Sequence, residues 1–369
     1  MKIAIVSTRG IPNNYGGLEE FAEHVSVGLV KRGHEVIVYN PHFHPYSSGD
    51  FKGVTVKKKF SPEKQLGTSA NFIYDYLSLR DAIKSNCDAI LVCGYTTASV
   101  SYLISSFKNS KVITNIDGLE WKRAKWNTLV RRLAKWFEEI AVDKSSALVS
   151  DNAAIEKYVF ENYKKPSFFI PYAANIQEAP DEAVIKEFGL EKYKYHILIG
   201  RLEPENNIEM ILDGVMLSKS EDVTVVFAST QTKYAKFLID RYKGCKKIIF
   251  RGWTSGQSIL FSLRHYAKIY FHGHSVGGTN PSLLEAMAGG AFIAAHENTF
   301  NQHVLGEDAL YFSSAFEVKK IIDNYEKINS SRETYRQNNL QKIRTFYNWE
   351  NIIDLYEKMF FSVTNKNNY

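Results

Sequence analysis

Residues 268–290 read KIYFHGHSVGGTNPSLLEAMAGG, and this stretch decides the fold. Its first five residues alternate in the manner of a buried strand, with Ile269 and Phe271 on one side. A glycine pair follows, and glycine adopts backbone conformations that other residues avoid. Thr279 or Asn280 can then cap a helix that begins at Pro281, because proline is favoured at the first helical position. The stretch therefore predicts a strand, a glycine turn and a helix N-terminus.

A helix N-terminus after a glycine turn suits an anion, because unpaired N–H groups lie at the positive end of the helix dipole. We expect the N–H groups of residues 282–284 to be free for a phosphate. Glu285 lies one turn further on, where its carboxylate can reach the diol of a ribose. The alternative is a turn whose glycines serve packing only, with Glu285 in solvent. The residues predicted to bind a nucleotide here are Gly277, Gly278, Thr279, Asn280, Ser282, Leu283 and Glu285.

The composition indicates a folded α/β protein of more than one domain. A chain of 369 residues exceeds the usual size of a single core. Its net charge of +6 is too small for this length to indicate nucleic acid. Three widely separated cysteines argue against a disulfide framework or a zinc site. We find neither a signal peptide nor a run of about 18 apolar residues, so we expect a cytoplasmic protein that can also lie on a membrane surface.

The N-terminal segment predicts a second anion site. Residues 2–7 form a strand, and apolar residues at helical spacing follow a glycine-containing loop. Gly16 and Gly17 lie at the start of that helix, and Arg9 can add positive charge. The spacing differs from the G-x-G-x-x-G fingerprint, which disfavours a nicotinamide cofactor. The alternative is a surface loop without a ligand.

Further strands and helices alternate along residues 54–150, which predicts a doubly wound parallel sheet. Ligands of such sheets bind beyond the carboxyl ends of the strands. Asp117 follows the strand KVITN and is a candidate to assist at the reacting centre. An Asp that only stabilises its own turn is the alternative.

Basic and aromatic residues are mixed in residues 120–140. This mixture suits an anionic membrane surface or a pyrophosphate-linked acceptor, and nucleic acid could use it too. A solvated amphipathic helix is the simpler interpretation. The helical spacing of Leu129, Leu133, Trp136, Phe137 and Ile140 predicts that they face the core. The residues predicted for acceptor or membrane contact are Arg9, Glu120, Trp121, Lys122, Arg123, Lys125 and Trp126.

A proline-containing segment, 168–180, predicts an interdomain linker, after which the strand–helix pattern restarts. Arg201 and Arg251 follow two strands of this second half, and each can bind a diphosphate or form an ordinary surface ion pair. The predicted boundaries are 1–170 for an N-terminal Rossmann-like domain, 171–345 for a C-terminal one, and 346–369 for a helix that packs back on them and a frayed tail.

Taken together, the landmarks of this chain resemble family 4 of the retaining glycosyltransferases. These landmarks are GG-x-E-x-F with RGHEV, IPYAAN, GRLEPENN, PSLLEAMAGG and NWENIIDLYEKMF. TRGIPNNYGGLEEF and HSVGGTNPSLLEAM are most similar to a bacterial branch that includes rhamnosyltransferases of surface-polysaccharide assembly. The resemblance implies two Rossmann-like doubly wound domains facing each other across a cleft (the GT-B fold), with the acceptor bound by residues 1–170 and the nucleotide sugar by residues 171–345. It implies no metal and no cofactor.

Three positions depart from the family pattern. Gly277 occupies the place of the first of two glutamates, Asn206 that of a lysine, and Asp117 that of a histidine. The resemblance then implies that Arg201, Ser282 and Leu283 hold the diphosphate of a dTDP- or UDP-sugar. The expected acceptor is a lipid-pyrophosphate-linked or oligosaccharide molecule. Two alternatives are a sugar-nucleotide epimerase or hydrolase of the same fold, and a non-catalytic membrane-associated module.

Overall fold

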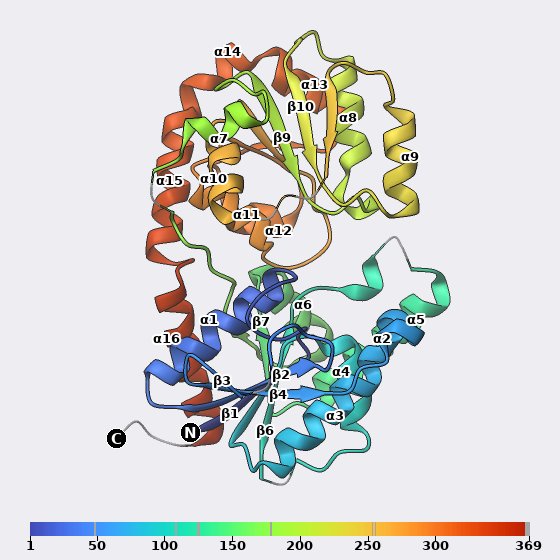
Figure 1. The fold of residues 1–369 in the computed structure, drawn as a ribbon, viewed down its shortest axis with the longest axis vertical. Helices are drawn as coiled ribbons and strands as arrows, with labels where there is room; N and C mark the ends of the chain where they lie inside the picture. Colours follow the sequence, from blue (N-terminus) through green and yellow to red (C-terminus); the bar gives the residue numbers. More distant parts are fainter. Residues whose placement is uncertain are drawn as a thin grey trace. The chain divides into compact units, whose positions relative to one another are not determined.

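The computed structural model describes residues 1–47, 49–107, 109–123, 126–177, 179–252, 254 and 256–365. The chain forms two compact units (Figure 1). Unit 1 comprises Met1–Lys122, Trp126–Tyr172 and Trp349–Tyr369, and unit 2 comprises Arg123–Lys125 and Ala173–Asn348. Each unit is an α/β structure with its own sheet.

The sheet of unit 1 has the strand order β3-β4-β2-β1-β5-β6-β7-β8. Neighbouring strands are parallel except β3, which pairs antiparallel with β4. The central strands are continuous apolar runs because helices cover both faces of such a sheet. The strands are β1 (Lys2–Val6), β2 (Glu35–Pro41), β3 (Gly49–Phe51), β4 (Val54–Lys59), β5 (Ala89–Val92), β6 (Lys111–Ile116), β7 (Ala147–Ser150) and β8 (Phe168–Phe169).

The helices of unit 1 include the last helix of the chain, which packs against the first (Figure 1). Trp349 stacks on His24 with 4.2 Å between ring centroids, and Arg32 Nη1 lies 2.9 Å from Glu357 Oε2. The C-terminal helix therefore belongs to unit 1. The helices are α1 (Gly17–Lys31), α2 (Glu63–Leu66), α3 (Asn71–Lys84), α4 (Tyr95–Tyr102), α5 (Thr128–Lys144), α6 (Ala153–Tyr163) and α16 (Trp349–Thr364), with short 3-10 helices at Gly67–Ala70 and Glu120–Lys122.

The sheet of unit 2 has the order β11-β10-β9-β12-β13-β14, and all its neighbouring strands are parallel. Strand β9 is fully buried along its length, as a central strand should be. The strands are β9 (Tyr195–Ile199), β10 (Val223–Phe227), β11 (Ile248–Arg251), β12 (Ile269–His272), β13 (Ile293–His296) and β14 (Leu310–Phe312).

The helices of unit 2 pack on this sheet, and α8 lies closely against α13. A Cβ on Gly214 would come within 2.5 Å of Val318 Cβ, so glycine permits this approach. The helices are α7 (Glu182–Glu187), α8 (Ile208–Leu217), α9 (Lys233–Arg241), α10 (Gln257–His265), α11 (Pro281–Ala288), α12 (Thr299–Leu305), α13 (Ala315–Asp323), α14 (Tyr325–Ile328) and α15 (Arg332–Thr345), with 3-10 helices at Pro204–Asn206 and Asn329–Ser331.

The structure confirms the predicted α/β class with two parallel sheets. The sheet of unit 1 also has an antiparallel edge strand, which the short hairpin β3–β4 adds. One expectation was wrong in part. Of the residues of α5 that we expected to face the core, Ile140 is buried and Phe137 is half-buried, whereas Leu129, Leu133 and Trp136 are 67%, 42% and 47% exposed.

Candidate donor-binding site

Each sheet has one point at which the strand order reverses. In unit 1 this switch point lies between β1 and β5, and in unit 2 between β9 and β12. Loops that leave two neighbouring strands in opposite directions open a crevice at such a point, and ligands of doubly wound sheets bind there. The loop after β9 carries Arg201, and the loop after β12 carries Gly277 and Gly278. The two predicted donor segments therefore flank the same switch point.

Hydrogen bonds join these two loops of unit 2. Asn207 Nδ2 donates to the Gly273 carbonyl at 2.8 Å, and Ser275 N donates to the Glu205 carbonyl at 3.0 Å. Asn206 Nδ2 donates to the Arg201 carbonyl at 2.7 Å. Asn206, which replaces a lysine of the family pattern, is thus buried and supports the backbone that presents Arg201.

Gly273 allows the two loops to meet. A Cβ at this position would lie 2.0 Å from the Asn206 carbonyl oxygen and 2.9 Å from Ile211 Cδ1. No larger residue fits without moving the backbone. His274 follows, with its Cε1 atom 3.4 Å from where a Cβ on Gly200 would be. The chain is therefore closely packed up to the residue before Arg201.

Asn280 caps α11, which resolves the choice between Thr279 and Asn280. Its Oδ1 atom accepts from Ser282 N at 2.9 Å, and its carbonyl accepts from Leu283 N at 3.0 Å and from Leu284 N at 3.2 Å. The expectation that these three N–H groups are free was wrong. The cap residue satisfies the helix end by itself, as side chains at helix N-termini commonly do.

The glycine turn before α11 is more open. Gly277 has φ 128°, and no atom lies within 4 Å of the place where its Cβ would be. Thr279 is buried, whereas Arg201 is exposed. A ligand can therefore approach the backbone at Gly277 and Gly278 without meeting side chains of those residues.

Glu285 is paired with an arginine that the sequence did not reveal. Arg264 Nη2 lies 2.5 Å from Glu285 Oε2, and the guanidinium is almost completely buried. Arg264 also lies over the ring of Tyr270, whose hydroxyl is 2.9 Å from Ser282 Oγ. Arg264 comes from α10, so no local pattern around Glu285 signals the pair. The pair orients the carboxylate that we assigned to a ribose.

Two histidines lie behind this site. The rings of His272 and His274 stack with 4.5 Å between centroids. Burial lowers the pKa of His274 to about 3, with a further contribution from the Arg201 charge. Burial also lowers the pKa of His272 well below its ordinary value. In the described part of the chain neither ring nitrogen of His272 has a hydrogen-bond partner. Both imidazoles are therefore neutral at physiological pH.

Arg251 is not brought to this switch point. It ends β11, an edge strand of the sheet of unit 2, and its Nη2 donates to the Phe188 carbonyl at 3.4 Å.

In unit 1 the predicted residues Arg9, Gly16 and Gly17 follow β1 and flank its switch point. Gly16 caps α1 in an extended conformation. Arg9 is engaged within the protein, because its Nη2 lies 2.5 Å from Glu63 Oε1 and its guanidinium is 4.0 Å from the ring centre of Tyr15. An acceptor that binds here would therefore contact Arg9, whose positive charge is partly neutralised by Glu63.

Two buried carboxyl groups lie near this switch point. They are Asp75, which the sequence did not single out, and Glu19, the glutamate of the GG-x-E-x-F landmark. Asp75 in α3 accepts from Thr97 Oγ1 at 2.5 Å, and burial raises the pKa of Asp75 to about 7. Glu19 accepts from the Arg9 N–H at 2.8 Å, and burial raises its pKa too. Asp117 directly follows β6, one strand further along the sheet.

The segment Glu120–Trp126 lies only partly within the described residues, and Lys125 lies outside them. Glu120 N donates to the Tyr95 hydroxyl at 3.3 Å, and Trp121 Nε1 donates to Glu138 at 3.1 Å. Lys122 is exposed, Trp126 is half-buried, and Arg123 Nη1 lies 3.7 Å from Glu205 Oε1 within unit 2.

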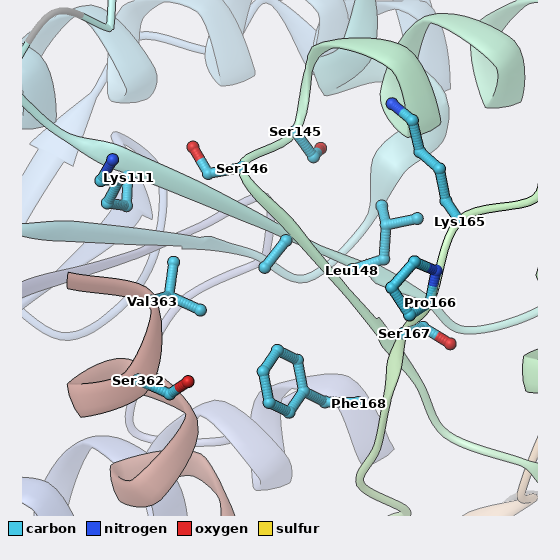
Figure 2. Close-up of a pocket in the computed structure, with 11 residues that line it drawn as sticks. Lys111, Ser145, Ser146, Leu148, Lys165, Pro166, Ser167, Phe168, Ser362 and Val363 are labelled. Atoms are coloured by element: carbon cyan, nitrogen blue, oxygen red, sulfur yellow. The ribbon is translucent and has the colours of Figure 1, made fainter. Parts of the chain in front are cut away.

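A pocket of about 580 Å³ lies in unit 1, at the amino ends of β6, β7 and β8 (Figure 2). Ser145 Oγ donates to the Ala141 carbonyl, Ser146 Oγ accepts from Val112 N, and Lys165 Nζ donates to the Val142 carbonyl. These polar groups are already used by the protein, and the pocket lies at the other end of the strands from the switch point. We do not assign the nucleotide to it.

The described residues hold no cluster of three or more His, Cys, Asp or Glu side chains that could bind a metal ion. Among those residues, none of the helices combines the length and the apolar character needed to cross a bilayer.

Comparisons with known proteins match both halves of the chain. Residues 1–175 match a domain of unknown function, DUF1972, and residues 181–342 match the model "Glycosyl transferases group 1". No curated protein matches the sequence.

Several solved structures are similar over almost the whole chain. Sucrose-phosphate synthase from Thermosynechococcus elongatus is 13% identical with a TM-score of 0.81, covering 99% of this chain and 100% of its own. Anabaena HepE in complex with UDP and glucose is 15% identical with a TM-score of 0.76, and the alignment covers 98% of this chain and 100% of HepE. Trehalose 6-phosphate synthase from Burkholderia multivorans is 11% identical with a TM-score of 0.71, and the alignment covers 99% of this chain and 97% of the synthase. The chain therefore has the GT-B fold, carries a glycosyl transferases group 1 domain, and is a glycosyltransferase.

Proposed function

We propose that the protein transfers a sugar from a nucleoside diphosphate sugar to a lipid-pyrophosphate-linked or oligosaccharide acceptor in bacterial surface-polysaccharide synthesis. The observation that carries this proposal is the arrangement at the switch point of unit 2. There the Arg201 loop and the open glycine turn are joined by hydrogen bonds, and Glu285 lies in the helix that follows.

The donor is a sugar linked to dTDP or UDP. Support for the nucleotide comes from the likeness to Anabaena HepE, whose structures contain UDP and UDP-glucose. Support for rhamnose comes only from the resemblance of the segments around Gly16 and Gly277 to rhamnosyltransferases. The anionic face of a membrane is the place where a lipid-linked acceptor would be met.

The diphosphate is assigned to Arg201 and to the backbone of residues 277–279. A guanidinium stays charged at all physiological pH values and binds phosphate oxygens in pairs. Ser282 and Leu283 can join only if the Asn280 cap gives up their N–H groups. Glu285 is assigned to the ribose, and Arg264 is the positioning residue that holds its carboxylate.

The reaction proceeds with retention of configuration and without a metal. As the glycosidic bond of the donor breaks, negative charge develops on the leaving diphosphate, and Arg201 stabilises it. The oxygen of the acceptor hydroxyl forms the new bond to the anomeric carbon on the face that the diphosphate leaves, and the proton of that hydroxyl passes to the leaving diphosphate. We assign the transferred sugar to Asp117, and the acceptor to Arg9 and residues 120–126.

Titration calorimetry of dTDP, UDP and GDP, in EDTA and then in magnesium, tests this function. One nucleotide should bind equally in both conditions. Arg201→Ala should weaken its binding roughly 10- to 100-fold, because a hydrogen bond to a charged group contributes about 1.5–3 kcal/mol. The matched control is Arg241→Ala, which removes an exposed arginine of α9 that is paired with Asp213. Turnover that survives Arg201→Ala in a folded protein would refute the role of Arg201. Release of the sugar without an acceptor, as rapid as its transfer with one, would refute the transferase activity.

A further inference from the structure

Two polar side chains at the switch point of unit 2 have open hydrogen-bonding capacity. The side chain of Glu205 is only 4% exposed, and neither of its carboxylate oxygens accepts a hydrogen bond from the described residues. The Nδ1 atom of His274 is also buried without a hydrogen-bond partner among those residues. Buried polar groups are nearly always hydrogen-bonded, so each exception needs an explanation. Where ligands of such sheets bind, a ligand is the first explanation to consider.

Both side chains come from the loops that carry the predicted donor residues. Glu205 lies in the 3-10 helix after β9, and His274 lies in the loop after β12. Ser275 joins the loops, because its N–H and its hydroxyl both donate to the Glu205 carbonyl, at 3.0 and 2.9 Å. Arg123 Nη1 lies 3.7 Å from Glu205 Oε1 within unit 2. Burial lowers the pKa of His274, and the charges of Arg201 and Arg123 lower it further, so both arginines lie near this imidazole.

The imidazole of His274 is held in place from several sides. Asn298 Nδ2 and Asn301 Nδ2 donate to the His274 carbonyl at 3.1 and 3.0 Å. The ring stacks on His272 with 4.5 Å between centroids, and its Cε1 atom lies 3.4 Å from where a Cβ on Gly200 would be. A side chain that is fixed before its ligand arrives loses little conformational freedom on binding.

An unpaired imidazole does not indicate a binding site by itself. Both ring nitrogens of His196 are also buried without a hydrogen-bond partner in the described part of the chain. His196 is the second residue of β9 and lies near the amino end of that strand. Glu205 and His274, in contrast, follow the carboxyl ends of β9 and β12, where the crevice of a doubly wound sheet opens. Their position, together with their open hydrogen-bonding capacity, indicates a ligand.

The chemistry of these two groups suits the hydroxyls of a sugar better than a phosphate. A carboxylate only accepts hydrogen bonds and repels another anion, whereas a hydroxyl can donate to it. A neutral imidazole has one donor and one acceptor, and a hydroxyl matches either. Gly277 and Gly278 offer only backbone groups, and Arg201 is assigned to the diphosphate. Glu205 and His274 therefore remain for the sugar.

We propose that Glu205 and His274 bind hydroxyl groups of the transferred sugar and determine which sugar the protein accepts. The carboxylate of Glu205 accepts a hydrogen bond from one hydroxyl, and a ring nitrogen of His274 pairs with another. A sugar that lacks a matching hydroxyl leaves a buried polar group unpaired, and sites of this kind reject such analogues strongly. The assignment rests on the proposed function, because it concerns the same donor.

Titration calorimetry with a nucleotide and with its nucleotide sugar separates the sugar contacts from the diphosphate contacts. UDP with UDP-glucose and dTDP with dTDP-rhamnose are the two pairs, and the pair that binds the wild type is used. Glu205→Gln should weaken the nucleotide sugar roughly 10- to 100-fold and leave the nucleotide within about twofold, as the loss of a hydrogen bond to a charged group predicts. His274→Phe keeps a ring that can stack on His272 and should weaken the nucleotide sugar roughly 3- to 10-fold.

His196→Phe is the matched control, because it removes an equally unpaired buried imidazole from the other end of β9 and should change neither affinity. Thermal unfolding of each variant shows that it is folded. If Glu205→Gln weakens both ligands by the same factor, Glu205 only supports the Arg201 loop and the assignment is wrong. Unchanged affinities in Glu205→Gln and His274→Phe would also overturn it. Wild-type protein that binds none of the nucleotides would refute the proposed function itself, and the sugar contacts with it.

Discussion

Gly273→Ala should damage the donor site more than any other single methyl group added to unit 2. The new Cβ would lie 2.0 Å from the Asn206 carbonyl oxygen, and Cβ atoms do not approach a heavy atom closer than 3.0 Å. The obstacle is backbone, which cannot rotate away as a side chain can. Either Asn206 or residue 273 must move by about 1 Å.

The cost of this movement follows from what the two loops hold. Overpacking of a closely packed site costs about 1–3 kcal/mol. For a unit of this size, each kcal/mol lowers the midpoint of unfolding by roughly 2–4 °C. Displacing Asn206 also moves the Arg201 carbonyl to which its side chain is bonded. A misplacement of about 1 Å at a reacting centre costs on the order of 100-fold in rate.

Scanning calorimetry and nucleotide titration measure the two effects separately. We expect Gly273→Ala to lower the unfolding midpoint and to weaken UDP or dTDP binding. Gly252→Ala is the matched control, because a Cβ there meets no atom within 4 Å and Gly252 has no left-handed φ. Wild-type affinity in Gly273→Ala would show that the loop joined to Asn206 does not hold the donor.

Two further predictions concern unit 1. Burial raises the pKa of Asp75 to about 7 in the folded protein, so the folded state binds more protons than the unfolded state from about pH 4 to 7, and stability falls as the pH rises through this window. Asp75→Asn should therefore be neutral at pH 4 and more stable by up to about 4 kcal/mol at pH 8 in denaturant titrations, and a gain that does not depend on pH would contradict the argument. Glu138→Ala should cost about 3–5 kcal/mol in the same titrations, because it leaves Lys135 and two tyrosine hydroxyls without their buried acceptor, and a cost below about 1 kcal/mol would show that this network is dispensable.

The central strands of both sheets could be predicted because strands covered by helices on both faces must be continuous apolar runs. The first strand is an example, since residues 2–7 are the predicted strand and Lys2–Val6 the observed one. The edge of the sheet was not predictable in this way. Strand β3 has only three residues, Gly49–Phe51, and none of them is buried. A strand this short has no period to detect, and its place depends on the neighbouring β4.

At the donor site the sequence indicated the local features but not the long-range pairs. The glycine turn and the capped helix follow from residues next to one another, and the sequence limits the cap to Thr279 or Asn280, of which the structure selects Asn280. The partner of Glu285 is 21 residues away in another helix, and the contact of Gly273 with Asn206 joins two different loops. Such contacts depend on the strand order, which brings the loops after β9 and β12 together. The strand order cannot be predicted from any single segment of the sequence.

Helix α5 shows why periodicity alone can place a face incorrectly. The spacing of Leu129, Leu133 and Trp136 correctly predicts that they share one side of a helix, but it does not say what that side meets. The buried residues of α5 are Ala134, Glu138, Ile140, Ala141 and Val142. The burial of Glu138 is possible because five side chains bond to it, those of Tyr95, Trp121, Lys135, Tyr158 and Tyr163. A rule that places the largest apolar residues inside cannot foresee a buried carboxylate, because its partners lie in other elements. Where local pattern and fold disagree in this way, a functional surface is the first explanation to test.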